Sequence, residues 1–419
     1  MRRARTVTAA ERRILSWVRR SANMAVARRM LDYMERSSWI RKMFEEGARL
    51  KKIHGEDKVF DFSLGNPNVP PPELVKQKLR ELAARDEPGM HGYMPNAGLA
   101  ETRQAVSAYL CTEYCVSMAQ DHIIATCGAA GGLNIILKAL LDPGDEVLVP
   151  APHFVEYGFY SENHGGTLKS VPTREDFTLD LDGLERAIGP KTKVILINSP
   201  NNPTGQIYSE EEIKLLGELI SRKNYELGHI IYLVSDEPYR RIVYDDCRVP
   251  CIFAHYENSL ITTSYSKDLS LPGERIGFVA VNPSADEVQK VLGALTLANR
   301  ILGFVNAPGL MQRLIVELQG ICVDVGIYRR KRDRLVSSLR AFGYELVVPK
   351  GAFYLFPKSP LADDVRFVRI LQEENILAVP GSGFAGPGHF RLAYCVDDRT
   401  IEGALPGFER ACAKARGMV

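Results

Sequence analysis

The sequence predicts an α/β fold in which a mostly parallel sheet is flanked by helices, together with a second, smaller α+β lobe. Short apolar runs rich in β-branched residues alternate with segments of helical spacing along the middle of the chain. Repeated strand-then-helix order is typical of parallel sheets with helices on their faces. The pairs Pro143-Gly144 and Pro272-Gly273 separate neighbouring elements.

The expected elements follow in order along the chain. Helical spacing of apolar residues predicts helices within 31–54 and at 73–84, 99–113, 131–141 and 210–222. Apolar runs predict strands at 121–126, 145–149, 166–171, 193–197, 230–235 and 260–263. A long helical section at 285–339 comes next, and the segments 345–356 and 390–394 are assigned to the smaller lobe.

Composition excludes several classes of protein but does not choose among enzymes. A chain of 419 residues with 45% hydrophobic and 25% charged residues has room for two domains and the make-up of a soluble globular protein. The net charge of +2 does not indicate a nucleic-acid partner, and no apolar run approaches the ~18 residues of a membrane span. The eight cysteines are scattered without a zinc-site partner set, so we expect no metal, reduced thiols and a cytoplasmic location.

The first 23 residues differ from the rest. They carry seven arginines and one glutamate, a charge of +6, which leaves −4 for the remaining chain. An arginine-rich, acid-poor lead with a weak apolar face is one form of organelle targeting segment. The other interpretation, which we favour, is a disordered basic extension or a start assigned upstream of Met24 or Met34.

The most informative segment contains Lys267. This lysine follows the apolar strand 260–263, Ser264 and Ser266 precede it, and Arg275 comes eight residues later. An amine that attacks an aldehyde must be held in place, and small hydroxyls with a guanidinium can bind a dianionic phosphate. The pattern therefore indicates a Schiff-base lysine beside a phosphate site, although a lone lysine in a serine-rich loop is more often a surface residue.

Two neighbouring strands also end in polar residues. Asn202 lies in a Pro/Asn/Gly turn after the strand 193–197, and Asp236 follows the strand 230–235 with Tyr239 three residues on. Ligands bind at the carboxyl ends of strands in open α/β sheets. A carboxylate and a phenol so placed can contact a protonated ring nitrogen and a ring oxygen of one heteroaromatic cofactor.

In combination these motifs resemble the class I/II, aspartate aminotransferase-like family of pyridoxal-phosphate-dependent enzymes of fold type I. The set comprises Asn-Pro-Thr-Gly at 202–205, Asp-Glu-Pro-Tyr at 236–239, Ser-x-Ser-Lys at 264–267 followed after seven residues by Arg-x-Gly, and Phe-Arg-Leu at 390–392. The resemblance covers about residues 37 to 391. It implies a seven-stranded-type sheet in a large cofactor-binding domain (71–305), a small domain formed by 24–70 and 306–419, and a homodimer with shared active sites.

The resemblance also implies how the chain holds pyridoxal 5′-phosphate. Lys267 would bind the cofactor covalently and act as base, Asp236 would keep the ring nitrogen protonated, and Phe154 would stack on the ring. Ring-oxygen contacts fall to Tyr239 and Asn202. The phosphate contacts fall by motif position to Gly128, Ala129, Ala130, Ser264, Ser266 and Arg275, with Tyr93 reaching the neighbouring subunit's phosphate. The Gly-rich turn at 128–132 is a weak signal alone, because a tight strand-to-helix turn needs glycine anyway.

Substrate contacts are implied for three residues. Arg391 would grip the α-carboxylate through two parallel hydrogen bonds, aided by the Gly65 backbone and by Asn202. Arg391 could instead be a salt-bridged surface residue on an edge strand. The implied reaction moves an amino group from an L-amino acid, aspartate or a broader range, to a 2-oxo acid such as 2-oxoglutarate. Some aspartate-specific relatives have a lysine where Ala130 stands here, and Arg300 is either a substitute cation or a solvated helix residue.

Two alternatives stay open at the level of sequence. The same site chemistry supports β-elimination from cysteine S-conjugates, because fold does not fix reaction type. An alternative of another class is a regulator with an idle aminotransferase domain. Such a regulator needs a DNA-binding module, and the residues before the motifs show no helix-turn-helix with a linker. The presence of Lys267, Asp236 and Arg391 also argues against an idle site.

Overall fold

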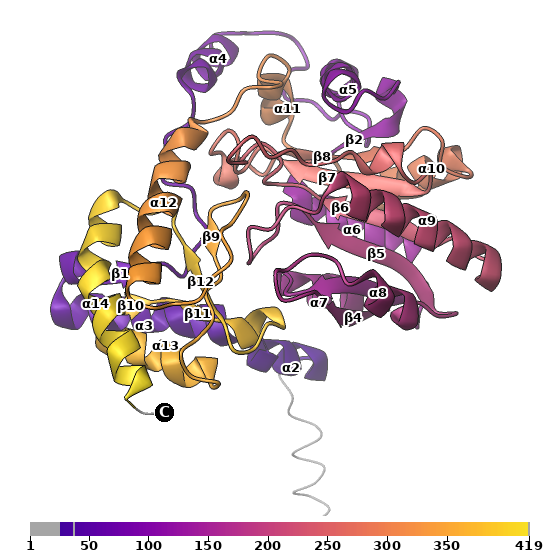
Figure 1. The fold of residues 1–419 in the computed structure, drawn as a ribbon. Helices are drawn as coiled ribbons and strands as arrows, with labels where there is room; N and C mark the ends of the chain where they lie inside the picture. The colour runs from indigo at the N-terminus through magenta and orange to yellow at the C-terminus, as the bar shows by residue number, and fades with distance from the viewer. Residues whose placement is uncertain (1–25, 37, 418–419) are drawn as a thin grey trace, which may run out of the picture.

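The computed structural model describes residues 26–36 and 38–417, and the predicted basic extension at 1–23 lies outside them. Figure 1 shows a large sheet with its helices on one side of the molecule and a smaller group of strands and helices on the other. The helices at 38–54 and 398–416 both lie in this smaller group, so segments from the two halves of the chain build it together.

The large sheet has seven strands in the order β2-β8-β7-β6-β5-β3-β4. Only β8 is antiparallel to its neighbours, which makes the sheet mostly parallel as predicted. The strands are β2 (Ile123–Thr126), β3 (Glu146–Ala151), β4 (Thr167–Pro172), β5 (Thr192–Asn198), β6 (Tyr232–Asp236), β7 (Ser259–Ser264) and β8 (Gly277–Val281). β8 was not predicted from the sequence, and the others lie within a few residues of their expected positions.

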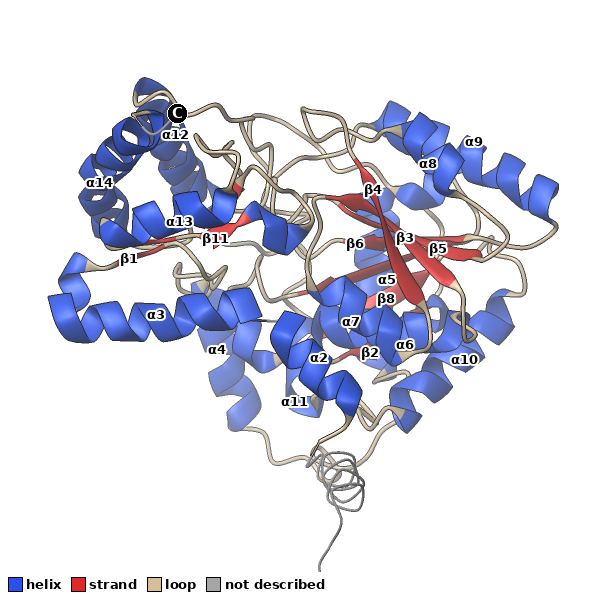
Figure 2. Ribbon diagram, turned by 90° about the horizontal axis from the view of Figure 1, so that it is seen from below, coloured by secondary structure: helices blue, strands red, loops and turns tan. Residues whose placement is uncertain are grey.

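Helices cover both faces of this sheet (Figure 2). In β5, Val194 and Leu196 pack into one apolar cluster while Ile195 and Ile197 pack into another, as alternation along a strand requires. The first cluster includes side chains of α6 (Gly128–Leu140), α7 (Glu156–Asn163) and α10 (Val288–Ile301). The second includes those of α4 (Glu73–Ala83), α5 (Ala100–Tyr114), α8 (Leu181–Ala187), α9 (Glu210–Leu227) and α11 (Gly309–Ile315).

The smaller group has its own apolar core. Its helices are α3 (Ser38–His54), α12 (Val325–Ala341), α13 (Asp364–Glu373) and α14 (Asp398–Arg416), whereas α2 (Arg28–Arg36) packs Tyr33 against Phe159 of α7. Its short strands are β1 (Phe60–Asp61), β9 (Tyr354–Leu355), β10 (Ile376–Leu377), β11 (Val379–Pro380) and β12 (Phe390–Ala393). β1 pairs with β10 in parallel, and β12 lies between β11 and β9 in an antiparallel sheet.

Several predicted boundaries were wrong for local reasons. α9 extends five residues past the predicted end because it begins with a capping box at Ser209 and Glu212 and ends only at Gly228, whose φ is +73°. α6 begins at residue 128, directly after β2, and not at 131. The section 285–339 is three helices, with Gly303 and Gly320 at positive φ in the breaks, and most of 345–356 is loop.

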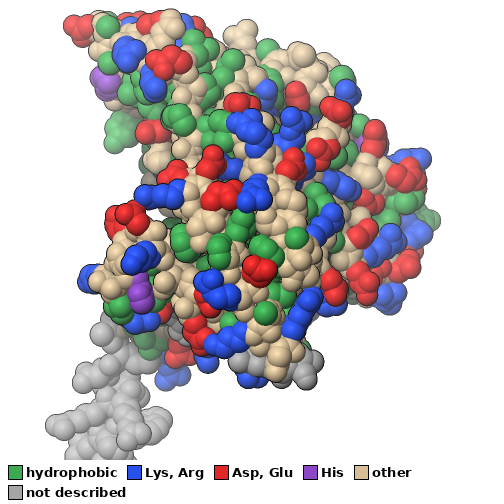
Figure 3. All heavy atoms as spheres, turned by 60° about the vertical axis from the view of Figure 1, so that its left-hand side comes forward, with side chains coloured by type: hydrophobic (Ala, Val, Ile, Leu, Met, Phe, Trp, Pro, Cys, Tyr) green, Lys and Arg blue, Asp and Glu red, His purple; other side chains and the backbone are tan. Residues whose placement is uncertain are grey.

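The surface carries both signs of charge. Acidic and basic side chains are interspersed over the face shown in Figure 3. Within residues 26–36 and 38–417, no helix combines the length and the apolar character needed to cross a bilayer. The same residues contain no group of three or more His, Cys, Asp or Glu side chains arranged to hold a metal ion.

Candidate active site

A cavity of about 290 Å³ lies between the large sheet and the smaller group of elements. It opens at the carboxyl ends of β5, β6 and β7, which are adjacent and parallel, with Asn198 in register with Asp236 and Asp236 with Thr262. The sheet thus places the three predicted strand-end motifs side by side. The predicted residues that line the cavity are Gly65, Ala129, Ala130, Phe154, Asn202, Asp236, Tyr239, Ser264, Ser266, Lys267, Arg275 and Arg391.

Lys267 points its amine into this cavity. Its Nζ donates a hydrogen bond to the Gly65 carbonyl at 2.9 Å and lies 5.5 Å from the centre of the Phe353 ring. Burial lowers the pKa of Lys267 to about 8, and the positive charges of Arg391 and Arg275 act in the same direction. A buried amine with a depressed pKa has a larger neutral fraction near neutral pH, which is the form that attacks a carbonyl carbon.

Asp236 has one satisfied and one unsatisfied oxygen. Tyr157 donates a hydrogen bond to Oδ2 at 2.7 Å, whereas Oδ1 is buried without a hydrogen-bond partner. Burial raises the pKa of Asp236 to about 7, the Tyr157 hydrogen bond lowers it, and the charge of Glu237 raises it. An orphaned buried carboxylate oxygen calls for a donor, and a protonated heteroaromatic nitrogen in the cavity would supply it.

The other end of the cavity is suited to an anion. Ala129 and Ala130 lie in the first turn of α6, where free backbone N–H groups and the helix dipole favour negative charge. Gly128, just outside the lining, has φ +71°, and a Cβ there would lie 2.9 Å from Arg275 Nη2. Ser264, Ser266 and Arg275 add hydroxyls and a guanidinium, as expected for a phosphate site.

Arg391 lies at the opposite wall from this anion site's helix, on the central strand β12 of the small sheet. It is 4% exposed, so the alternative of a surface arginine on an edge strand is wrong. Its Nη1 donates to Asn202 Oδ1 at 3.0 Å and its Nη2 to the Ser63 carbonyl at 2.6 Å, while Nε is buried without a hydrogen-bond partner. A buried guanidinium with unused donor capacity suits a carboxylate ligand.

A larger cavity of about 520 Å³ lies elsewhere, between the loop 172–177 and the segments 345–347 and 385–389. It contains none of the predicted site residues; of its two cations, Arg174 and Lys358, the second is paired with Glu345 at 3.3 Å. The residues with displaced pKa values Lys267 and Asp236, and the orphaned atoms Asp236 Oδ1 and Arg391 Nε, lie at the smaller cavity, which is therefore the better candidate for chemistry.

Comparison with known proteins agrees with this geometry. The family model described as aminotransferase class I and II matches residues 57–407. The chain belongs to this family. An aspartate/prephenate aminotransferase of Thermus thermophilus is 34% identical over 362 residues, covering 84% of this chain and 90% of the relative. An aspartate aminotransferase of Pyrococcus horikoshii is 30% identical and covers 92% of this chain and 97% of its own length.

Solved structures show the same fold. An aminotransferase from Eubacterium rectale has a TM-score of 0.90 at 40% identity, covering 94% of this chain and 99% of that one. An aspartate aminotransferase from Thermus thermophilus, solved with maleate, has a TM-score of 0.80 at 29% identity, covering 89% and 96%. The predicted family, fold type and enzyme class are thereby confirmed. The protein is an aminotransferase, and aminotransferases of this family depend on pyridoxal phosphate.

Sequence reasoning missed three tyrosines of this aminotransferase's site, Tyr157, Tyr160 and Tyr354. Tyr354 on β9 places its hydroxyl 2.8 Å from that of Tyr239, and its ring faces the Arg391 guanidinium at 4.8 Å. A Cβ on Gly65 would overlap the Tyr354 hydroxyl, which explains the need for glycine there. Tyr157 lies in the first turn of α7, close in sequence to the predicted Phe154, and the two rings pack edge-on with their centres 5.6 Å apart.

Tyr93 is a predicted residue that lies outside the lining of its own chain's cavity. Its side chain is 96% exposed. Its loop is tied to the segment after α10, because Asn96 donates to the Val305 carbonyl at 2.9 Å and Asn306 to the Pro95 carbonyl at 2.7 Å. A fixed loop with an exposed aromatic side chain is typical of an interaction surface.

Proposed function

We propose that the 290 Å³ cavity binds pyridoxal 5′-phosphate and that the enzyme uses it to transfer an amino group from aspartate to 2-oxoglutarate. The observation that carries this proposal is the orphaned Asp236 Oδ1, which shares one cavity with the Lys267 amine and the anion site at α6. When bound, the cofactor supplies an aldehyde that condenses with amines and a ring that withdraws electrons from the substrate's Cα.

Each residue then has one task. Lys267 Nζ would hold the cofactor at its aldehyde carbon, and as a free amine it would take the proton from the substrate's Cα. Asp236 keeps a proton on the ring nitrogen through Oδ1, and Tyr239 donates a hydrogen bond to the ring oxygen. Phe154, two residues before α7, would cover a face of the ring, and it packs edge-on against Tyr157 with the ring centres 5.6 Å apart.

The phosphate and the substrate carboxylate occupy opposite ends of the proposed site. Gly128, Ala129, Ala130, Ser264, Ser266 and Arg275 hold the phosphate. Arg391 binds the α-carboxylate, with Asn202 and the Gly65 backbone beside it. Because lysine offers no planar fork, Arg391→Lys is expected to raise KM for the amino acid by about a hundredfold, a loss of about 2–3 kcal/mol, while cofactor binding stays intact.

The choice of aspartate is supported by the names of several relatives and by the maleate bound to a structural neighbour, since maleate is also a four-carbon dicarboxylate. A second carboxylate needs a second cation. Among the described residues that line the cavity, Lys267, Arg275 and Arg391 are the cations, and each already has a task. Arg300 is exposed at the end of α10, and its neighbour Asn299 donates to the Asn96 carbonyl at 2.8 Å.

The Asn299 hydrogen bond thus ties the end of α10, which carries Arg300, to the loop that carries Tyr93. We propose a homodimer in which this region completes the partner's site, with Tyr93 at the phosphate and Arg300 near the substrate's distal carboxylate. Arg300→Leu is then expected to raise KM for aspartate at least tenfold and to leave KM for phenylalanine unchanged. Equal changes in KM for both amino acids would show that Arg300 does not contact the distal carboxylate. The enzyme would then be expected to accept a broader range of amino donors.

A screen of amino donors with 2-oxoglutarate tests the overall assignment. Aspartate is expected to give the highest kcat/KM, with glutamate formed in equal amount to oxaloacetate. Release of pyruvate and ammonia from cysteine S-conjugates at a higher rate than transamination would assign the enzyme to the β-lyases instead. We also propose a cytoplasmic location, which is supported by the eight cysteines all being free thiols.

A further inference from the structure

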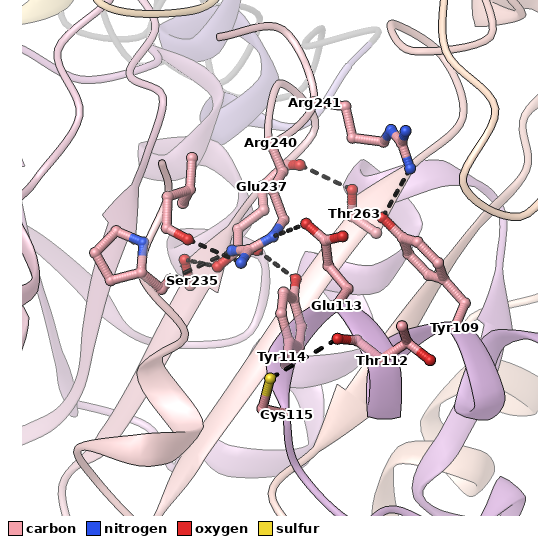
Figure 4. A network of polar contacts seen from close by, with 12 residues as sticks. Tyr109, Thr112, Glu113, Tyr114, Cys115, Ser235, Glu237, Arg240, Arg241 and Thr263 are labelled. Carbon is pink, nitrogen blue, oxygen red and sulfur yellow. Dashed lines mark hydrogen bonds and ion pairs between the residues drawn. The ribbon is translucent and has the colours of Figure 1, made fainter. Parts of the chain in front are cut away.

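A buried polar cluster lies behind the turn that carries Asp236 and Tyr239. Figure 4 shows Tyr114, Glu237 and Arg240 pointing toward one another in it. Asp236 and Tyr239 line the cofactor cavity, whereas Glu237 and Arg240 do not. Asp236 ends β6 and Glu237 continues its pairing with β7, so the two side chains point to opposite sides of the strand. The cluster around Glu237 therefore lies on the side of the turn away from the cavity.

The carboxylate of Glu237 is fully used within this cluster. It is 1% exposed, and its Oε1 accepts a hydrogen bond from Ser235 Oγ at 2.8 Å. Its Oε2 accepts from the Tyr114 hydroxyl at 2.7 Å and from Arg240 Nη1 at 3.0 Å. The backbone is fixed as well, since Glu237 N donates to the Thr262 carbonyl at 2.8 Å and continues the pairing of β6 with β7.

Arg240 is also buried, and its Nε, which has no hydrogen-bond partner, lies 3.8 Å from Glu113 Oε1. Its side chain is 11% exposed, and its guanidinium lies 3.9 Å from the centre of the Tyr114 ring. Its Nη2 donates to the Val249 carbonyl at 2.8 Å and its Nη1 to the Pro250 carbonyl at 3.3 Å. The pair with Glu237 therefore ties the turn to the loop at 249–250. A buried pair broken on one side leaves an uncompensated charge.

If Arg240 were replaced, the unpaired negative charge of Glu237 would act on Asp236. Tyr157 and Tyr160 of α7 and Tyr239 of the same turn face Asp236 as neutral phenols, and Lys267 and Arg275 line the same cavity as cations. Glu237 is the anion that raises the pKa of Asp236, in addition to burial. Arg240, paired with Glu237 at 3.0 Å, offsets that anion.

We propose that Arg240 is a positioning residue whose ion pair with Glu237 holds the 236–239 turn and neutralises the carboxylate behind Asp236, so that Asp236 is ionised when a protonated ring nitrogen binds. The inference rests on the proposed role of Asp236 in cofactor binding. It assigns no contact with cofactor or substrate to Arg240 itself.

The test measures the affinity of pyridoxine 5′-phosphate by calorimetry between pH 5 and 9. This probe has an alcohol where the cofactor has its aldehyde, so it cannot bond to Lys267, and its affinity reports the ring and phosphate contacts. Affinity is expected to fall on the acid side as Asp236 takes up a proton. In Arg240→Met the midpoint of this fall moves up by about one pH unit, as expected for an unpaired like charge nearby. The acid limb of kcat/KM moves with it.

Further variants separate charge from packing. Glu237→Gln alone leaves a cation behind Asp236 and moves the midpoint down. The double variant Glu237→Gln/Arg240→Met removes both charges and returns the midpoint to within about 0.3 unit of wild type, a cancellation expected of coupled charges. Arg240→Lys keeps the charge and leaves the midpoint in place.

A matched control is Arg332, whose guanidinium lies over the Tyr244 ring at 4.6 Å and pairs with Asp245 at 2.6 Å, but which is absent from the cavity lining. Arg332→Met is expected to lower thermal stability without moving the midpoint. The proposal is overturned if the pH midpoint does not move in Arg240→Met. It is also overturned if the midpoint of the double variant moves as far as that of Arg240→Met. If Arg240→Met does not fold, Glu237→Gln still decides, because an upward or absent movement contradicts the proposal. Wild-type pH dependence in Asp236→Asn would instead contradict the proposed function.

Discussion

Replacing Asp236 with asparagine keeps the shape of the side chain and removes the charge that the proposed mechanism needs. Burial raises the pKa of the carboxyl from its ordinary value of 3.8 to about 7. A rise of about three pKa units, at ~1.36 kcal/mol each, corresponds to about 4 kcal/mol. By this free energy the empty cavity disfavours the ionised form of Asp236. A hydrogen bond to a charged group is itself worth about 1.5–3 kcal/mol.

We therefore expect Asp236→Asn to lose about 2–4 kcal/mol of transition-state stabilisation. This loss corresponds to a rate of amino-group transfer about thirty- to a thousandfold lower. Stopped-flow absorbance of the bound cofactor after mixing with aspartate measures this rate directly. Asp245→Asn is the matched control, because Asp245 pairs with Arg332 outside the cavity and its side chain is 54% exposed. An Asp236→Asn rate within tenfold of wild type would refute the assignment of Asp236 as the nitrogen partner.

In the enzyme without cofactor, the same substitution is expected to raise the free energy of unfolding. Because folding raises the pKa of Asp236, its carboxyl contributes stability that is present below about pH 4 and is lost as pH rises through about 7. Asparagine has no such dependence. At pH 8 the cofactor-free Asp236→Asn variant is expected to be more stable than wild type by up to about 4 kcal/mol in urea unfolding, with no difference at pH 4. A less stable variant at pH 8 would contradict the buried, unpaired state of Asp236.

Three further predictions follow from single contacts. The rate at which cofactor-free enzyme captures pyridoxal phosphate is expected to rise with pH with a midpoint near 8, because burial lowers the pKa of Lys267 to about 8, and a midpoint above 10 would refute this. Gly65→Ala is expected to displace Tyr354 and to lower kcat/KM by at least tenfold, whereas Gly273→Ala, where a Cβ meets open space, changes little. Mixed dimers of inactive Lys267→Ala and Tyr93→Ala chains are expected to regain activity, because one of their two sites carries neither defect. Verified mixed dimers without activity would place Tyr93 outside the partner's site.

Much of the cavity could be predicted because its residues lie at the ends of strands with clear sequence signals. The apolar runs before Asn202, Asp236 and Lys267 identify the strands, and parallel pairing in a sheet brings their carboxyl ends to one edge. The strand β8 was missed although its residues are apolar, because it follows the phosphate motif at Arg275 without a helix between.

Other features depend on contacts between distant parts of the chain and leave no local pattern. The hydroxyl contact of Tyr354 with Tyr239 spans 115 positions, and that of Tyr114 with Glu237 spans 123. The segment before β9 is loop, so neither period 2 nor period 3.6 identifies Tyr354. Whether Arg391 is buried was likewise open from sequence, because a four-residue strand reads the same at an edge and at the centre of a sheet.

The identity of the lysine that bonds to the cofactor tests the account most directly. The enzyme is loaded with pyridoxal phosphate, reduced with borohydride, digested and analysed by mass spectrometry. We expect one modified peptide, which contains Lys267, and no modified peptide from Lys267→Ala. A cofactor adduct on any other lysine, or near-normal transamination by Lys267→Ala, would contradict it.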